Sequence, residues 1–216
     1  MSLKLEPATA RKALLETAAE LYQARLLTPT GGNISLRAEP DVIWITPRGL
    51  FKGGLREEDL ILVDGDGRVR QGRHPPSRET PLHMSIYAAR PDVGAIIHSH
   101  PPLAITFGLF DLPVKPVTAG AVLFRNLPVV EFLLPGTPAL ARRATEALGD
   151  EPAALLRNHG AVVVGADLRQ AADRTHALEE TCLTLLLARL IAAEPAVIPA
   201  ALVGKLLSPG YPSIGG

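Results

Sequence analysis

The sequence has one cysteine, two methionines and one tryptophan, and it has no net charge, because 22 lysines and arginines balance 22 aspartates and glutamates. The single cysteine, Cys182, cannot form a disulfide within the chain, and its apolar surroundings favour a small buried side chain over a reactive thiol. A neutral chain has no general attraction for nucleic acid or an anionic membrane. We therefore expect neither partner, and any anion site must be local.

Long uninterrupted hydrophobic runs are also missing. The longest uncharged stretch, 93–110, carries two histidines, a serine and two prolines at its centre, which lipid hydrocarbon does not accept without polar partners. The N-terminus lacks the apolar core of a secretory signal. These absences predict a soluble protein of the cytoplasm.

Asparagine, glutamine, methionine and cysteine are scarce, whereas proline and arginine are plentiful. This composition is typical of a thermophilic source. A GC-rich genome gives much the same composition, so both explanations stay open.

Hydrophobic patterning predicts helices and short strands along the whole chain. Apolar residues at helical spacing predict helices at 7–27, 80–90, from 102 onward, 138–148 and 167–191. Runs of apolar and branched residues predict strands at 34–37, 42–46, 60–63, 68–71, 93–98, 129–130, 153–157 and 161–164. The elements do not alternate strictly, which argues against a doubly wound parallel sheet. We predict one α/β domain over residues 1–216, with a central mixed sheet flanked by helices and a tail at 195–216 rich in proline and glycine.

Three histidines follow predicted strands. His98 and His100 are two residues apart at the end of an apolar strand, so their side chains point to the same face and can share an ion. Alone, this pair is equally well explained as two hydrogen-bonded histidines. His159 lies in a tight turn between two short strands, where we expect Gly160 to take a backbone conformation that other residues resist. Three imidazoles at strand ends are typical of an open catalytic metal site with a free position for water or substrate.

A carboxylate stands at the start of a predicted helix. Glu79 follows Pro75-Pro76-Ser77, and the helix dipole stabilises an acidic residue there, so a capping role is favoured when Glu79 is considered alone. Beside a metal it would instead serve as a general base. His83 lies four residues further on the same helix face, and it is better explained as a buried hydrogen-bonding residue than as a fourth ligand.

Two kinds of loop offer anion-binding groups. The segment from Thr30 to Ser35 supplies glycine N–H groups and polar side chains suited to phosphate. Arg48 and Arg78 lie in two further loops, where each can clamp a phosphate or carboxylate or remain a solvated surface charge. When the first segment is taken alone, an ordinary glycine turn is the favoured explanation.

Five short segments, in order, resemble the class II aldolase/adducin family: TGGNIS (30–35), TPRG (46–49), PSRE (76–79), HSH (98–100) and NHG (158–160). Each motif is short, but their order and spacing extend from the first predicted helix to the last. The resemblance implies an α/β fold with a largely antiparallel sheet.

The same resemblance implies roles for individual residues. His98, His100 and His159 would bind one zinc ion, or another divalent metal, in each subunit. Glu79 would be the catalytic acid/base, and Tyr211 in the tail would donate a proton over the active site. The positions implied for the substrate and its phosphate, together with the two loop arginines, are Thr30, Gly31, Asn33, Arg48, Gly49, Ser77 and Arg78.

The sequence departs from the pattern of the family's aldolases at three places. Arg48 replaces a usual threonine and Arg78 a usual serine, and a guanidinium binds phosphate or an additional carboxylate more strongly than a hydroxyl does. A tyrosine used as a proton donor in the middle of the chain has no counterpart near Val117. The metal and base resemble the family more closely than the substrate-binding residues do.

The function implied is aldol cleavage of a ketose 1-phosphate into dihydroxyacetone phosphate and an aldehyde through an enediolate, by a homotetramer with sites between subunits. The same site also suits an epimerase or a dehydratase of sugar phosphates, or a decarboxylase of a phosphorylated 3-oxo acid. A non-catalytic, adducin-like binding module is disfavoured because all three histidines and Glu79 are present.

Overall fold

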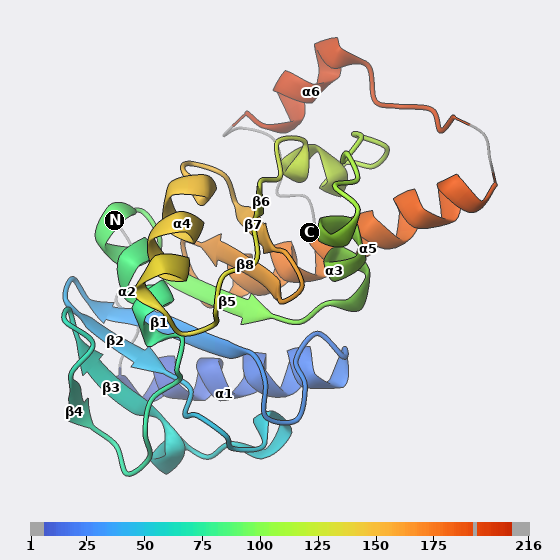
Figure 1. Ribbon diagram of the computed structural model, residues 1–216. Coiled ribbons are helices and arrows are strands. Elements are labelled where there is room, and N and C mark those ends of the chain that lie inside the picture. The colour runs from blue at the N-terminus through green and yellow to red at the C-terminus, as the bar shows by residue number, and fades with distance from the viewer. Residues whose placement is uncertain (1–6, 192–193, 209–216) are drawn as a thin grey trace.

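The computed structural model describes residues 7–191 and 194–208 (Figure 1). Its centre is an eight-stranded sheet in the order β4-β3-β2-β1-β5-β8-β7-β6. Neighbouring strands are antiparallel except β6 and β7, which are parallel, so the predicted mixed and largely antiparallel sheet is confirmed. The strands are β1 (Asn33–Glu39), β2 (Val42–Ile45), β3 (Ile61–Asp64), β4 (Val69–Gln71), β5 (Ala95–Ser99), β6 (Val129–Val130), β7 (Ala153–Leu156) and β8 (Gly160–Gly165).

Helices cover both faces of the sheet. The α-helices are α1 (Pro7–Gln23), α2 (Thr80–Ala89), α3 (Pro102–Leu109), α4 (Pro138–Leu148), α5 (Leu168–Leu190) and α6 (Ala200–Leu206), with 3-10 helices at Lys52–Gly54, Glu57–Asp59 and Gly120–Phe124. Figure 1 shows α2 and α4 on one side and α1 and α5 on the other. None of the helices in the described ranges is long and apolar enough to cross a lipid bilayer.

Strand periodicity decides which side chains face α2. Ile96 of β5 and Val162 of β8 pack in the core cluster that includes α2 and α4, whereas Ile97 packs against α1 on the opposite face. Successive strand residues alternate between faces, so His98 lies on the same side as Ile96, toward α2. Asn33 of β1 is paired in register with His98 and therefore shares that face.

The first helix ends earlier than the apolar pattern predicts. Arg25 takes a positive φ of 62°, and the backbone N–H groups of Leu26 and Leu27 donate to the carbonyl oxygen of Leu21 at 2.9 and 3.2 Å. These bonds close the helix end and turn both leucines into the core, where they are 3% exposed. The prediction of a helix to residue 27 was wrong. The apolar pattern indicates burial, but here the closing turn, and not a continued helix, buries the two leucines.

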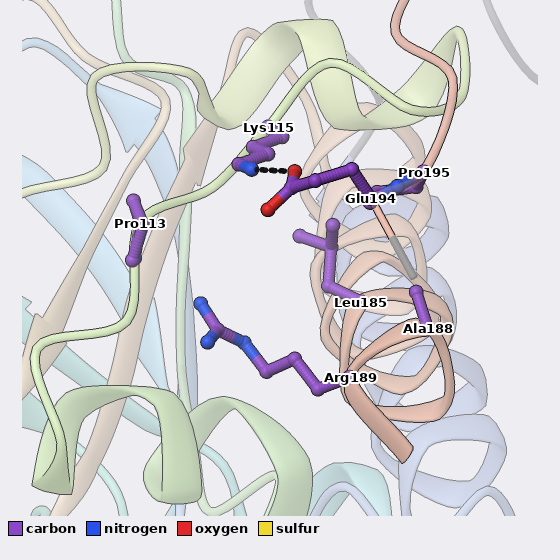
Figure 2. A pocket seen from close by; sticks show the side chains of 7 residues that line it. All are labelled: Pro113, Lys115, Leu185, Ala188, Arg189, Glu194 and Pro195. Carbon is purple, nitrogen blue, oxygen red and sulfur yellow. Dashed lines mark hydrogen bonds and ion pairs between the residues drawn. The ribbon is translucent and has the colours of Figure 1, made fainter. Parts of the chain in front are cut away.

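The tail contains structure that the sequence pattern did not indicate. Residues 200–206 form α6, and the segment before it is held by the ion pair between Glu194 and Lys115, 2.5 Å from O to N. Figure 2 shows this pair at a pocket that Leu185 and Arg189 of α5 also line. The backbone N–H of Ile198 donates to the carbonyl oxygen of Pro116 at 2.8 Å. The predicted proton donor, Tyr211, lies outside the described residues.

Candidate active site

The structure brings the three predicted histidine ligands together. His98 is the residue before the last of β5 and His100 directly follows the strand, while His159 occupies the turn between β7 and β8. The Nε2 atoms of His98 and His100 are 3.1 Å apart, and the rings of His98 and His159 have centroids 4.7 Å apart. One nitrogen from each ring lies within 4.8 Å of the others. Such a cluster suits one small cation.

The hydrogen bonding of His98 shows that a positive charge belongs in this cluster. Its Nδ1 is 3.0 Å from the carbonyl oxygen of Ala161, which can only accept, so Nδ1 carries a hydrogen. In a neutral ring Nε2 then has a lone pair, yet it lies 2.8 Å from Oε2 of Glu79. Two electron-rich atoms at that distance need a proton or a metal cation between them. The residues present therefore fit a divalent cation.

Two further atoms support this fit. Oε1 of Glu79 and Nδ1 of His159 are buried and have no hydrogen-bond partner. Burial, together with the neighbouring His98, lowers the pKa of His100 to about 3 and that of His159 to about 4, although Glu79 acts in the opposite direction. Both rings are therefore neutral at physiological pH, which is the form that ligates metal.

Glu79 does not act as a helix cap. It occupies the position before α2, but its side chain makes no cap hydrogen bond. Its carboxylate instead lies 2.8 Å from His98 and 3.5 Å from His159, and it accepts a 3.1 Å hydrogen bond from Nδ2 of Asn33. Burial raises the pKa of Glu79, but these three contacts together lower it by more. The net shift of the pKa is therefore downward, and the carboxylate is ionised.

Gly160 is required for space. A Cβ atom there would lie 2.3 Å from the carbonyl oxygen of Ser99 and 2.9 Å from the ring of His100. The left-handed residue of this turn is Asn158, with φ 59°, and Gly160 is not among the residues with positive φ. Our prediction of an unusual backbone at Gly160 was wrong, since what the site needs is close approach of two strands around the histidines.

The predicted phosphate-binding residues lie on loops that are tied to one another. Pro47 and Pro76 form an isolated β-bridge, and the N–H of Arg48 donates to the carbonyl oxygen of Pro75 at 3.1 Å. Arg48 and Arg78 therefore sit on adjacent loops, and both are exposed. Buried Ser77 accepts a 3.2 Å hydrogen bond from the N–H of Glu79.

In the predicted phosphate-binding loop at 30–35, some groups already make contacts within the protein. The N–H of Gly31 donates to Oγ1 of Thr28 at 2.9 Å, and a Cβ on Gly31 would lie 2.9 Å from the His100 ring. Thr30 and Gly49 are exposed. The amide of Asn33 is turned away from the loop toward Glu79 and His83. The loop thus packs directly on a histidine of the cluster.

A buried lysine, which no sequence pattern singles out, supports these loops. Lys52 is 1% exposed, and its Nζ donates to the carbonyl oxygens of Pro47 and Leu50 at 3.0 and 3.2 Å. Its backbone N–H donates to the carbonyl oxygen of Pro29 at 2.8 Å. One residue therefore connects the segments 28–33 and 46–50. A lysine in a polar loop normally indicates a solvated charge.

We expect the free energy of unfolding to rise with pH because of Lys52. Burial lowers the pKa of Lys52 from 10.5 to about 8, so between these values the unfolded chain binds more protons than the folded chain. The gain is about 3 kcal/mol at most across that window. Denaturant unfolding at about pH 7.5 and pH 10 measures it, with Lys52→Met as the control that lacks this titration. An equal pH dependence in both proteins would contradict the expectation.

The fold and site together define an α/β protein with a candidate metal centre. A family model, the class II aldolase and adducin N-terminal domain, matches residues 12–186. The chain belongs to the class II aldolase and adducin family, whose members are generally metal-dependent, and this membership supports a lyase.

Individual relatives agree with this assignment. The chain is 33% identical over 178 residues to an L-fuculose phosphate aldolase of Methanocaldococcus jannaschii, covering 82% of this chain and 96% of the relative. It is 32% identical to a 3-oxo-tetronate 4-phosphate decarboxylase of Haemophilus influenzae, covering 79% and 84%. A solved L-fuculose 1-phosphate aldolase superposes with a TM-score of 0.84 at 26% identity, covering 95% of this chain and 97% of that one.

Proposed function

We propose that the protein is a zinc-dependent aldolase that cleaves a ketose 1-phosphate, similar to L-fuculose 1-phosphate, into dihydroxyacetone phosphate and an aldehyde. The single observation that carries the proposal is the ionised Glu79 carboxylate facing three clustered imidazoles. A base next to a cation site is what proton removal beside a carbonyl requires. The relative of M. jannaschii, which is named an L-fuculose phosphate aldolase, supports the choice of substrate.

His98, His100 and His159 would hold the metal. When bound, the ion supplies a Lewis acid that stabilises negative charge on the substrate oxygens. In the condensation direction Glu79 removes a proton from the hydroxyl-bearing carbon beside the carbonyl of dihydroxyacetone phosphate, which gives an enediolate. The new carbon–carbon bond forms to the aldehyde carbon, and Tyr211 donates a proton to the resulting alkoxide. Cleavage is the reverse of these steps.

The phosphate would bind at the three loops around the cluster. Thr30, Gly31, Gly49 and Ser77 supply small polar or backbone groups, and Arg48 and Arg78 supply charge from adjacent loops. Binding of the phosphate at these loops would fix the position of the reacting carbon relative to Glu79. We assign Asn33 to Glu79 instead of to the phosphate, because its amide already bonds the carboxylate.

A second candidate function is decarboxylation of a phosphorylated 3-oxo acid. Two exposed arginines on adjacent loops favour it, since a substrate with both a phosphate and a carboxylate needs two anion contacts. The relative of H. influenzae, named as such a decarboxylase, supports it as well. Epimerisation or dehydration of a sugar phosphate would use the same metal and base, but no contact in the described residues favours either.

Assay of the purified protein with two substrates separates these functions. We expect L-fuculose 1-phosphate to release dihydroxyacetone phosphate, measured by its enzymatic reduction with NADH. A phosphorylated 3-oxo acid, 3-oxo-tetronate 4-phosphate, is tested in parallel for release of carbon dioxide. Turnover of the oxo acid alone would replace the aldolase proposal with the decarboxylase.

We further propose a homotetramer with active sites between subunits. Exposed apolar side chains support an interface, among them Phe110 at 69% and Leu134 at 67% exposure. Light scattering on the purified protein measures the assembly. Location in the cytoplasm and a thermophilic source stay predictions from the sequence.

A further inference from the structure

A row of buried polar side chains lies behind Glu79, between β1 and α2. Glu79, His83 and Tyr87 follow one another at four-residue spacing, so they share one face of α2. They meet Asn33 and Ser35, which are two residues apart on β1 and share its α2 face. His83 and Ser35 are completely buried, and the other three are at most 7% exposed. Buried polar groups of this kind must satisfy one another.

The direction of the first two hydrogen bonds follows from the Asn33 amide. Its Nδ2 can only donate and lies 3.1 Å from Oε2 of Glu79, which therefore accepts. The amide carbonyl Oδ1 then points to Nε2 of His83 at 2.5 Å. Since Oδ1 can only accept, Nε2 of His83 carries a hydrogen.

The rest of the row follows from a neutral imidazole. Burial and the nearby His98 lower the pKa of His83 to about 3, against the effect of Glu79, so Nδ1 has a lone pair. The hydroxyl of Ser35 donates to that lone pair at 2.6 Å, and its oxygen accepts from the hydroxyl of Tyr87 at 2.9 Å. The alternative acceptor for Tyr87, the carbonyl oxygen of Gly94, is further away at 3.4 Å. All four bonds therefore run in one direction, toward Glu79.

We infer that His83 is a positioning residue for the base of the proposed aldolase: its neutral Nε2–H form fixes the Asn33 amide so that an N–H group, and not the carbonyl oxygen, faces Glu79. The two ends of an amide are nearly equal in shape, so the neighbours at both ends decide its orientation, here Glu79 at Nδ2 and His83 at Oδ1. Rotated, Asn33 would place its carbonyl oxygen against Oε2 of Glu79, and the hydrogen bond to Glu79 would be lost. Glu79 would then lack one of the contacts that place it as a base.

This inference rests on the proposed function for its catalytic consequence and on the contacts of β1 and α2 for its structural part. The hydrogen bonds of the His83 ring go to Asn33 and Ser35, and not to the three histidines or the two arginines. Its loss should therefore lower kcat and leave KM and metal content unchanged. If His83 only stabilised the fold, its loss would lower the melting temperature and the amount of active protein. It would not lower kcat selectively while KM and metal content stay the same.

Two substitutions of His83 separate its two nitrogens. The amide nitrogen of Gln reaches the place of Nε2, whereas that of Asn reaches only the place of Nδ1. We expect His83→Gln to retain most of kcat, and His83→Asn to lose about 10–100-fold, the usual range for groups that orient an active-site residue. His176→Gln is the matched control, because His176 pairs with Glu20 between α1 and α5. Equal losses in the Gln and Asn variants would overturn the inference.

The tautomer gives a readout that needs no substrate. Nitrogen-15 NMR of the histidine rings, with the His83 signals identified by their loss in His83→Gln, should show a hydrogen on Nε2 and none on Nδ1 at neutral pH. A hydrogen on Nδ1, alone or in an imidazolium, would overturn the inference whatever the enzyme does. If the wild-type protein shows the expected tautomer but turns over no ketose 1-phosphate, the proposed function fails and the orientation of Asn33 stands.

Discussion

Glu79→Gln is expected to reduce turnover by about 10²–10⁴-fold, the range by which a positioned general base accelerates proton transfer. Gln has nearly the same shape as Glu, so the space beside His98 stays filled, but its amide cannot take the proton from the substrate carbon. The three imidazoles are untouched, and we expect the metal content per chain to stay the same. Steady-state kinetics and elemental analysis on the same preparation measure both quantities.

The matched control for this prediction is Glu39→Gln. Glu39 ends β1 and is exposed, so removal of its charge should leave kcat within about twofold, as surface substitutions usually do. Unchanged turnover in Glu79→Gln would show that the carboxylate is not the base. Loss of metal together with turnover would show instead that Glu79 helps to hold the ion.

The histidine cluster was visible in the sequence because its signals are local. A strand period of two puts His98 and His100 on one face, and the turn around His159 is marked by its own residues. The strand order and the closeness of the 46–49 and 76–79 loops depend on long-range pairing, such as the bridge between Pro47 and Pro76. Periodicity alone cannot supply such pairing.

The features that residue patterns alone left open share one physical cause. The side chain of Glu79 can cap its helix or turn toward His98, and both conformations are sterically open at a helix start. Which one it adopts depends on the residues of the neighbouring strands. The sequence pattern of Lys52 indicates a surface charge, but its Nζ donates to two carbonyl oxygens of one loop and its backbone N–H to a carbonyl oxygen of another. His83 was predicted to be a buried hydrogen-bonding residue, but its partners, Asn33 and Ser35, lie about fifty positions earlier in the chain.

The two candidate functions share one set of proposed catalytic residues and differ in the substrate, and these two parts of the site come from different parts of the fold. The proposed metal ligands and base come from strand ends and a helix start in the rigid centre, an arrangement that can serve several reactions of the same carbanion type. The arginines come from loops, where substitutions change the substrate without disturbing the core. Two relatives with different names, an aldolase and a decarboxylase, match this chain at nearly the same identity. We therefore expect the residues of these loops to decide between the two substrates.

His159→Ala is expected to lose the bound metal, with the stoichiometry per chain falling from about one to near zero, because two imidazoles hold a divalent ion far more weakly than three. His159 is the best choice among the three, since it lies in a turn and its side chain is 13% exposed, whereas His98 is completely buried and bonded to Ala161. Elemental analysis after dialysis without chelator measures the loss, and turnover should fall with it.

The control for the metal measurement is His176→Ala, which removes a histidine that contacts Glu20 at the surface of α1 and α5 and should keep a full complement of metal. Zinc retained by His159→Ala would refute the ligand set. A wild-type protein that carries no stoichiometric metal would argue for the adducin-like binding module, because the 2.8 Å contact between His98 and Glu79 would then be an imidazolium–carboxylate pair that holds β5 to α2. The same measurement thus decides whether this contact is structural or part of a catalytic centre.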